Sequence, residues 1–71
     1  MKDFNGTTIK VGQKCLMAFN KYDSAQLMNG TIKAIKPFGK ETKNTVFVQP
    51  DSSLDGSTKR TREPHLQIII L

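Results

Sequence analysis

Basic side chains form two clusters in this 71-residue chain. The first cluster holds four lysines within eleven residues: Lys33, Lys36, Lys40 and Lys43. The second cluster holds three cations in one short segment: Lys59, Arg60 and Arg62. Cations at such spacing can contact neighbouring phosphates and release their counterions, which makes binding depend on salt. These seven residues are therefore predicted to contact a nucleic-acid backbone, against the alternative that turn lysines are merely solvated and keep sheet edges from pairing.

Phe47 is the aromatic residue that we predict to add base stacking to this interface, because every base has a face that can stack on a ring. A second hypothesis uses the aromatic side chains of Tyr22, Phe38 and Phe47, or an exposed strand edge, to bind a protein. The chain would then be an interaction or inhibitor module, such as a small viral or mobile-element accessory protein that binds an acidic host protein surface. One continuous basic face favours nucleic acid, whereas dispersed lysines beside an exposed apolar patch favour a protein partner.

The other reactive side chains form no catalytic or metal-binding pattern. Cys15 stands in an apolar run and the single histidine, His65, is far from it in the sequence, so no nucleophile and base are paired. One cysteine and one histidine do not make a metal site. The acids are scattered, and no glycine-rich phosphate loop or paired-carboxylate motif is present. We predict a protein that is not an enzyme and that has no cofactor.

Charge and length restrict the partners further. A net charge of +5 and a pI near 9.7 favour an acidic partner, either nucleic acid (DNA or RNA) or an acidic protein surface. A single cysteine cannot form an intramolecular disulfide, which predicts a reduced, cytoplasmic protein. Apolar runs such as residues 68–71 are too short to span a bilayer, and we predict no membrane association.

The elements that must position these cations are short extended runs separated by Gly, Asn, Asp, Ser and Pro. Such a pattern predicts an all-β fold, a small five-stranded antiparallel barrel. We expect strands over residues 14–19, 27–36, 45–49, 58–62 and 67–71. Residues 1–10 form a lead-in segment, residues 11–71 form the barrel, and residues 20–26 are expected to be a loop.

Three local features refine this expectation. Gly30 is predicted to bend the second strand from within, because small barrels need sharp curvature. Ile32 and Ile35 have opposite parity, so a bulge near residues 33–34 is needed for both to face the core. A short turn of 3-10 helix at residues 64–66 is expected before the last strand. The predicted core consists of Val11, Cys15, Met17, Ile32, Val46, Val48, Leu66 and Ile69.

The order of these elements resembles the SH3-like small barrels and, among them, the Tudor and KOW-type modules. The shared motifs are Val-Gly-x-Lys at residues 11–14, Gly-Thr-Ile at 30–32, Gln-Pro-Asp at 49–51 and Pro-His-Leu at 64–66. The resemblance covers roughly residues 10–71 and implies an SH3-like fold. It does not extend to an aromatic cage for a methylated cation, since Ser52 and Ser53 stand where an aromatic residue is expected. Residues 20–26 also lack the glycines that are usual in the corresponding loop of KOW modules.

Overall fold

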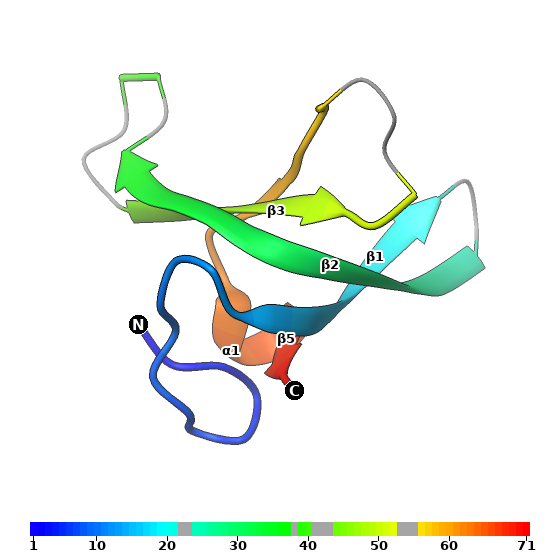
Figure 1. Ribbon diagram of the computed structural model, residues 1–71, viewed down its shortest axis with the longest axis horizontal. Helices are drawn as coiled ribbons and strands as arrows, with labels where there is room; N and C mark the ends of the chain where they lie inside the picture. Colours follow the sequence, from blue (N-terminus) through cyan, green and yellow to red (C-terminus); the bar gives the residue numbers. More distant parts are fainter. Residues whose placement is uncertain (22–23, 38, 41–43, 53–55) are drawn as a thin grey trace.

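The computed structural model describes residues 1–21, 24–37, 39–40, 44–52 and 56–71. Its strands are β1 (Lys14–Lys21), β2 (Ser24–Pro37), β3 (Asn44–Pro50), β4 (Lys59–Thr61) and β5 (Ile68–Ile70), shown in Figure 1. One helical turn, α1 (Pro64–Gln67), joins β4 to β5 within this part of the chain. The prediction of an all-β fold with five antiparallel strands is confirmed.

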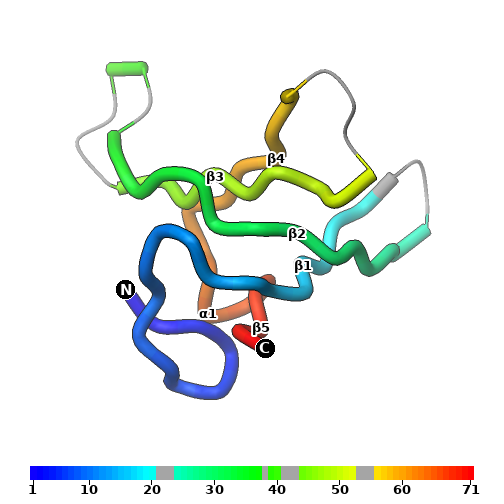
Figure 2. Tube along the Cα trace, viewed as in Figure 1, coloured from blue at the N-terminus to red at the C-terminus, as the bar shows by residue number. Residues whose placement is uncertain are grey.

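The strands form one sheet in the order β4-β3-β2-β1-β5. β2 is the longest strand and crosses the whole molecule, pairing with β1 along its first half and with β3 along its second (Figures 1 and 2). β4 and β5 are the two edges of this order, and no ladder between them is found in the described residues. The barrel is therefore not closed by backbone hydrogen bonds. The division into a lead-in segment and a barrel stays a prediction.

β2 continues through Gly30, as the sequence predicted. Gly30 pairs with Cys15 on β1 and with Pro50 on β3, so it lies where the two halves of the sheet meet. A Cβ atom at this position would lie 2.6 Å from Cγ1 of Val48. The absence of a side chain therefore lets β3 approach β2 closely at the bend.

The predicted bulge is also confirmed. The register between β2 and β3 shifts between Ile32 and Ala34, so Lys33 is the extra residue. Ile32 then stands opposite Val48, and Ile35 stands opposite Val46. The shift turns both isoleucines toward the core despite their opposite parity, because the bulge adds one residue to one strand.

Five of the eight predicted core residues are buried: Cys15, Met17, Ile32, Val46 and Val48. Ile9 and Ile68 complete the core, and Ile69 is only partly buried. The prediction was wrong for Val11 and Leu66, which are 62% and 58% exposed. Val11 precedes β1, in a turn where Gly12 has a φ of 95°. Leu66 belongs to α1. Neither residue lies in a paired strand, and the side chains of both are exposed.

The loop expected over residues 20–26 is instead mostly strand. β1 extends to Lys21 and β2 begins at Ser24, and these two residues are paired in the ladder. Tyr22 lies outside the described residues. Polar side chains did not prevent the ladder from forming, since backbone groups make its hydrogen bonds.

The turn before the last strand is α-helical rather than 3-10. The backbone N–H of Ile68 donates to the carbonyl oxygen of Pro64, four residues earlier. Pro64 occupies the first turn of α1, where a missing N–H is tolerated. The element was placed correctly, and its hydrogen-bond spacing differs by one residue.

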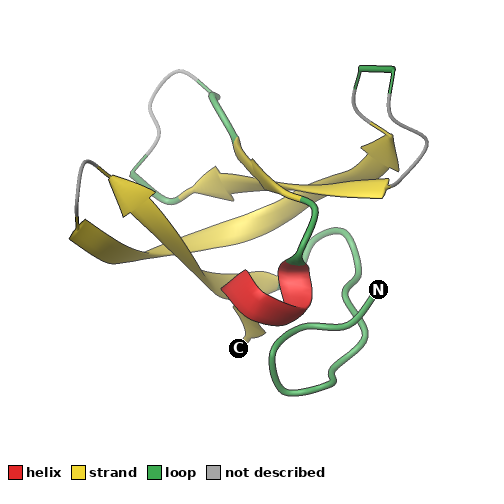
Figure 3. Ribbon diagram, turned by 180° about the vertical axis from the view of Figure 1, so that it is seen from behind, coloured by secondary structure: helices red, strands yellow, loops and turns green. Residues whose placement is uncertain are grey.

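The N-terminal segment covers the outer edge of β5, as Figures 1 and 3 show from two sides. The N–H of Phe4 donates to the carbonyl oxygen of Ile68 at 2.7 Å. The N–H of Ile70 donates to Oδ2 of Asp3, also at 2.7 Å. The segment thereby protects an edge that would otherwise be open to pairing with another chain.

Asp3 organises this segment through its carboxylate. Oδ1 accepts the N–H groups of Asn5 at 2.9 Å and Thr7 at 2.7 Å, while Oδ2 accepts that of Ile70. The hydrogen bond from Ile70, supported by the loop N–H groups, holds the pKa of Asp3 below its usual value, although burial opposes this effect.

The lowered pKa of Asp3 predicts an acid-sensitive stability. A group whose pKa is lower in the folded state stabilises the fold above its unfolded pKa, near 3.8. The free energy of unfolding should therefore lose this contribution as the pH falls below about 4. Asp3→Asn should lower the melting temperature at pH 7, because an amide cannot accept all three N–H groups. The melting temperature of this variant should also fall less at acid pH, because an amide does not titrate there. Thermal unfolding between pH 2 and 7 measures both effects.

Asp51→Asn is the matched control for this prediction. Asp51 is exposed and forms an ion pair with Lys14, in which Nζ and Oδ1 are 3.4 Å apart. Because exposed pairs contribute little, this change should leave the melting temperature nearly unaltered. Equal melting curves for Asp3→Asn and the unsubstituted protein at pH 7 would contradict the role given to Asp3.

Candidate nucleic-acid interface

Phe47 lies at the centre of the outer face of β2, β3 and β4. Its neighbours Val46 and Val48 are buried in the core, so Phe47 points to the opposite face of β3. In the ladders it stands opposite Ala34 of β2 and Arg60 of β4. Directly opposed residues share a face of the sheet, so Arg60 lies beside Phe47 on the outside.

A second cross-strand row follows the same face. Thr45 stands opposite Lys36 of β2. Arg62, just after β4, lines one pocket together with Thr45 and Arg60. Register thus gathers four of the predicted residues on one surface. We call it the basic face; it consists of Lys36, Thr45, Phe47, Arg60 and Arg62.

The ring of Phe47 is covered by a cation. Nζ of Lys36 lies 5.4 Å from the centroid of this ring. Such a position favours the ammonium electrostatically and restricts the flexible lysine side chain. In this arrangement Phe47 positions Lys36, and a base could stack on the ring only after displacing the ammonium group of Lys36.

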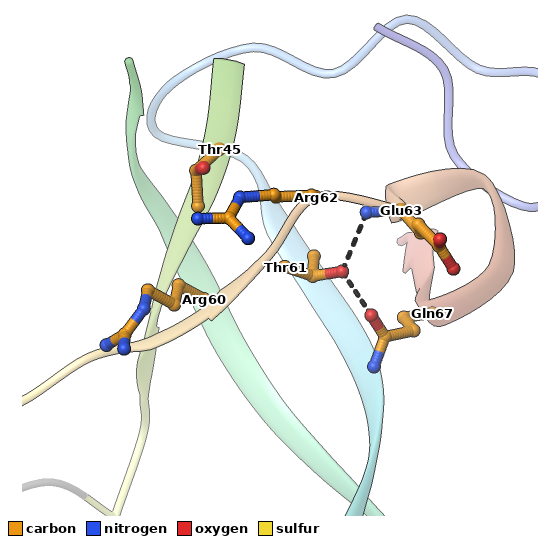
Figure 4. A pocket seen from close by; sticks show the side chains of 6 residues that line it. All are labelled: Thr45, Arg60, Thr61, Arg62, Glu63 and Gln67. Carbon is orange, nitrogen blue, oxygen red and sulfur yellow. Dashed lines mark hydrogen bonds between the residues drawn. The ribbon is translucent and has the colours of Figure 1, made fainter. Parts of the chain in front are cut away.

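The pocket on this face has a volume of about 390 Å³. Its lining side chains, drawn in Figure 4, are Thr45, Arg60, Thr61, Arg62, Glu63 and Gln67. Figure 4 shows the guanidinium of Arg62 extending toward Thr45, whereas the carboxylate of Glu63 points the other way. The half of the pocket nearer β3 is therefore cationic.

Gln67 fixes the other half of the pocket. Its Nε2 donates to the carbonyl oxygen of Ala18 on β1 at 3.2 Å, and its Oε1 accepts from the hydroxyl of Thr61 on β4. The same hydroxyl accepts the N–H of Glu63 at 3.0 Å. One side chain thus ties β4 to β1 and fixes the backbone of β4 at Thr61, between the two arginines.

Thr45 is the unusual member of this pocket. It is 1% exposed, and its Oγ1 is buried with no hydrogen-bond partner among the described residues. Burying a hydroxyl without a partner is unfavourable. Nothing in the spacing of charges pointed to Thr45, because its position depends on the register with Lys36.

Lys33 lies earlier in β2, where it lines a pocket with Thr31 and Gln49 rather than with the residues of the basic face. As the bulged residue of β2 it lines a pocket of about 290 Å³ together with Lys14 and Asp51. Lys14 was not among the predicted residues, and it pairs with Asp51 through Nζ and Oδ1 at 3.4 Å. Its alignment opposite Thr31 of β2 brings it there, which sequence spacing does not reveal.

Among the remaining predicted cations, Lys59 does not join the basic face. Lys59 stands opposite Val48, so it lies on the other side of β4 from Arg60, and its Nζ is 5.5 Å from the ring of Phe19. Lys40 is exposed in the turn after β2. Lys43 falls outside the described residues, as does Phe38.

The profile of one protein family, a domain of unknown function named DUF7205, matches residues 1–70. The chain belongs to this family. The match includes the N-terminal segment with Asp3 as well as the whole sheet. No curated protein and no solved structure matches the chain. The resemblance of this DUF7205 domain to SH3-like barrels stays a prediction.

Cys15 is fully buried, and burial raises the pKa of its thiol, with a further contribution from Asp51. No group of three or more potential metal ligands is present among the described residues. In the same residues, no helix has the length and apolar character needed to cross a membrane.

Proposed function

We propose that this protein is a binding module, not an enzyme, that contacts the nucleic-acid backbone with low sequence specificity. The observation that supports it is the convergence of Lys36, Arg60 and Arg62 on one face around Phe47. Arginine forks hold phosphate oxygens through two parallel hydrogen bonds, which lysines cannot do. We also infer a cytoplasmic setting, which suits a chain whose single cysteine is an unpaired thiol.

Low specificity follows from what the basic face offers. Phosphate contacts position a protein on nucleic acid but carry no sequence information. The ring of Phe47 is covered by Lys36, so cations rather than an aromatic surface meet the ligand first. The described residues contain no helix long enough to enter a major groove, since α1 has four residues.

Salt dependence tests this proposal. The logarithm of the affinity for a mixed-sequence duplex should fall linearly with the logarithm of salt, by about 0.9 per phosphate neutralised. Replacing both arginines, Arg60→Ala with Arg62→Ala, should reduce that slope by about 1.8, because two contacts are lost. Fluorescence anisotropy of a labelled duplex at several salt concentrations measures the slope.

The matched control removes the same charge elsewhere. Lys2→Ala with Lys10→Ala also lowers the net charge by two, but both lysines belong to the N-terminal segment. This pair should leave the slope nearly unchanged if the basic face is the binding surface. Equal losses in the two double variants would mean that net charge alone drives binding, and the proposed interface would be wrong.

A second candidate function is binding to an acidic protein surface. It is favoured by a groove of about 200 Å³ to which no charged side chain contributes. The residues that line it are Phe4, Leu16, Ala18, Leu27, Leu66, Gln67 and Ile69. A protein that meets only phosphates does not need such a groove, whereas protein interfaces combine apolar and charged surface. Absence of duplex binding at tens of micromolar protein in low salt would favour this candidate.

A further inference from the structure

The hydroxyl of Thr45 points to a more specific site within the basic face. It is enclosed, makes no hydrogen bond in the described structure, and belongs to a residue on the outer face of the sheet rather than in the apolar core. A buried hydroxyl normally finds a partner, so one without a partner is a place where a ligand atom would be favourable.

The surroundings of this hydroxyl are cationic. Lys36 stands directly opposite Thr45 on β2, while Arg60 and Arg62 line the pocket on the other side. The carboxylate of Glu63, which also lines the pocket, points away from this half of it (Figure 4). A group that enters between these side chains must therefore be an anion with oxygen acceptors.

We propose that Thr45, Arg60 and Arg62 form a subsite for a single phosphate group. The arginine forks hold the phosphate oxygens, and the Thr45 hydroxyl donates to one oxygen after the anion has drawn the Arg62 side chain aside. This inference rests on the proposed function, because a backbone phosphodiester is the occupant it assigns. Free phosphate shares the chemistry and serves as a probe.

The subsite requires a side chain above Thr45 to move, and the proposal assigns this movement to Arg62, which lines the same pocket. Because Oγ1 of Thr45 has no access to solvent, a ligand reaches it only when a covering side chain moves. Arg62 extends toward Thr45 from the end of β4 and is exposed, so it can move without disturbing the core. Thr61 and Gln67 stay in place, since their hydrogen bonds join β4 to β1.

Thr45→Val tests the subsite because it separates binding from folding. Valine has nearly the same shape but no hydroxyl, and the hydroxyl makes no bond in the free protein. The melting temperature should therefore stay equal or rise. The affinity for inorganic phosphate should nevertheless fall about tenfold, the effect of one lost hydrogen bond to a charged group. Nuclear magnetic resonance titration with phosphate, against chloride at equal ionic strength, measures this affinity.

Two further variants sharpen the experiment. Arg62→Lys keeps the charge but loses the fork, and it should weaken phosphate binding by a similar factor. Thr7→Val makes the same chemical change in the N-terminal segment, outside the basic face, and should leave phosphate binding unchanged. In the unsubstituted protein, the largest shifts should appear at the amides of Thr45, Thr61 and Arg62.

The outcomes separate the subsite from the function on which it rests. Phosphate binding by Thr45→Val at the level of the unsubstituted protein would overturn the subsite. If that variant also binds duplex normally while the double arginine variant does not, the nucleic-acid function stands without the subsite. If phosphate binds in the pocket and duplex does not bind at all, the subsite stands and the nucleic-acid function fails.

Discussion

Ile68→Ala is expected to lower the free energy of unfolding by about 2–5 kcal/mol. Ile68 is fully buried and stands opposite Met17 in the ladder between β5 and β1. Truncation removes apolar atoms from the core and leaves a cavity that the surrounding strands fill only partly. A domain of this length has a total stability of about 4–11 kcal/mol at the usual value per residue, so the loss would be a large share.

Leu66→Ala provides the matched comparison, two residues away. Leu66 is 58% exposed, so the same kind of truncation should cost no more than about 0.5 kcal/mol. Urea unfolding followed by circular dichroism gives both values. A larger cost for Leu66→Ala than for Ile68→Ala would contradict the burial of Ile68 and the exposure of Leu66.

Gly30→Ala is expected to cost about 3 kcal/mol, at the upper end of the range for overpacking. The new Cβ would lie 2.6 Å from Cγ1 of Val48 and 2.8 Å from the carbonyl oxygen of Gln49. The second contact is with backbone, which no side-chain rotation relieves. β3 must then separate from β2 at the bend that joins the two halves of the sheet.

A double-mutant cycle tests that steric reason. Val48→Ala removes one of the two clashing atoms, so Gly30→Ala should cost less in its presence than in the unsubstituted protein. The rescue should be partial, because the carbonyl oxygen of Gln49 remains. Strict additivity of the two changes in urea unfolding would rule out the close contact as the cause.

Part of the basic face follows from the sequence, and part depends on register. The two charge clusters were visible as spacing, and alternation along β4 already separates Lys59 from Arg60. The bulge at Lys33 was expected from the sequence, whereas the pocket that Lys33 shares with Lys14 and Asp51 was not. Thr45 was not predictable, because a threonine in a strand carries no signal of what lies across from it.

The last strand shows why the core could not be read completely. Residues 68–71 are all aliphatic, so no alternation marks the inward positions. The length of α1 and the pairing of Met17 with Ile68 decide that Ile68 faces inward. Leu66 was placed in the core because it is apolar, yet it projects from a helical turn at the surface.

The sequence by itself determined the elements whose signals are local. The strand content, the bend at Gly30 and the bulge at Lys33 follow from residue type and parity within a few neighbours. Tertiary structure decided the contacts between distant residues. Asp3 accepts the N–H of Ile70 across 67 positions, and Gln67 reaches Ala18 across 49. Such partners come within hydrogen-bond distance only when the sheet has curled. No local sequence pattern indicates which of two residues so far apart in the chain will meet.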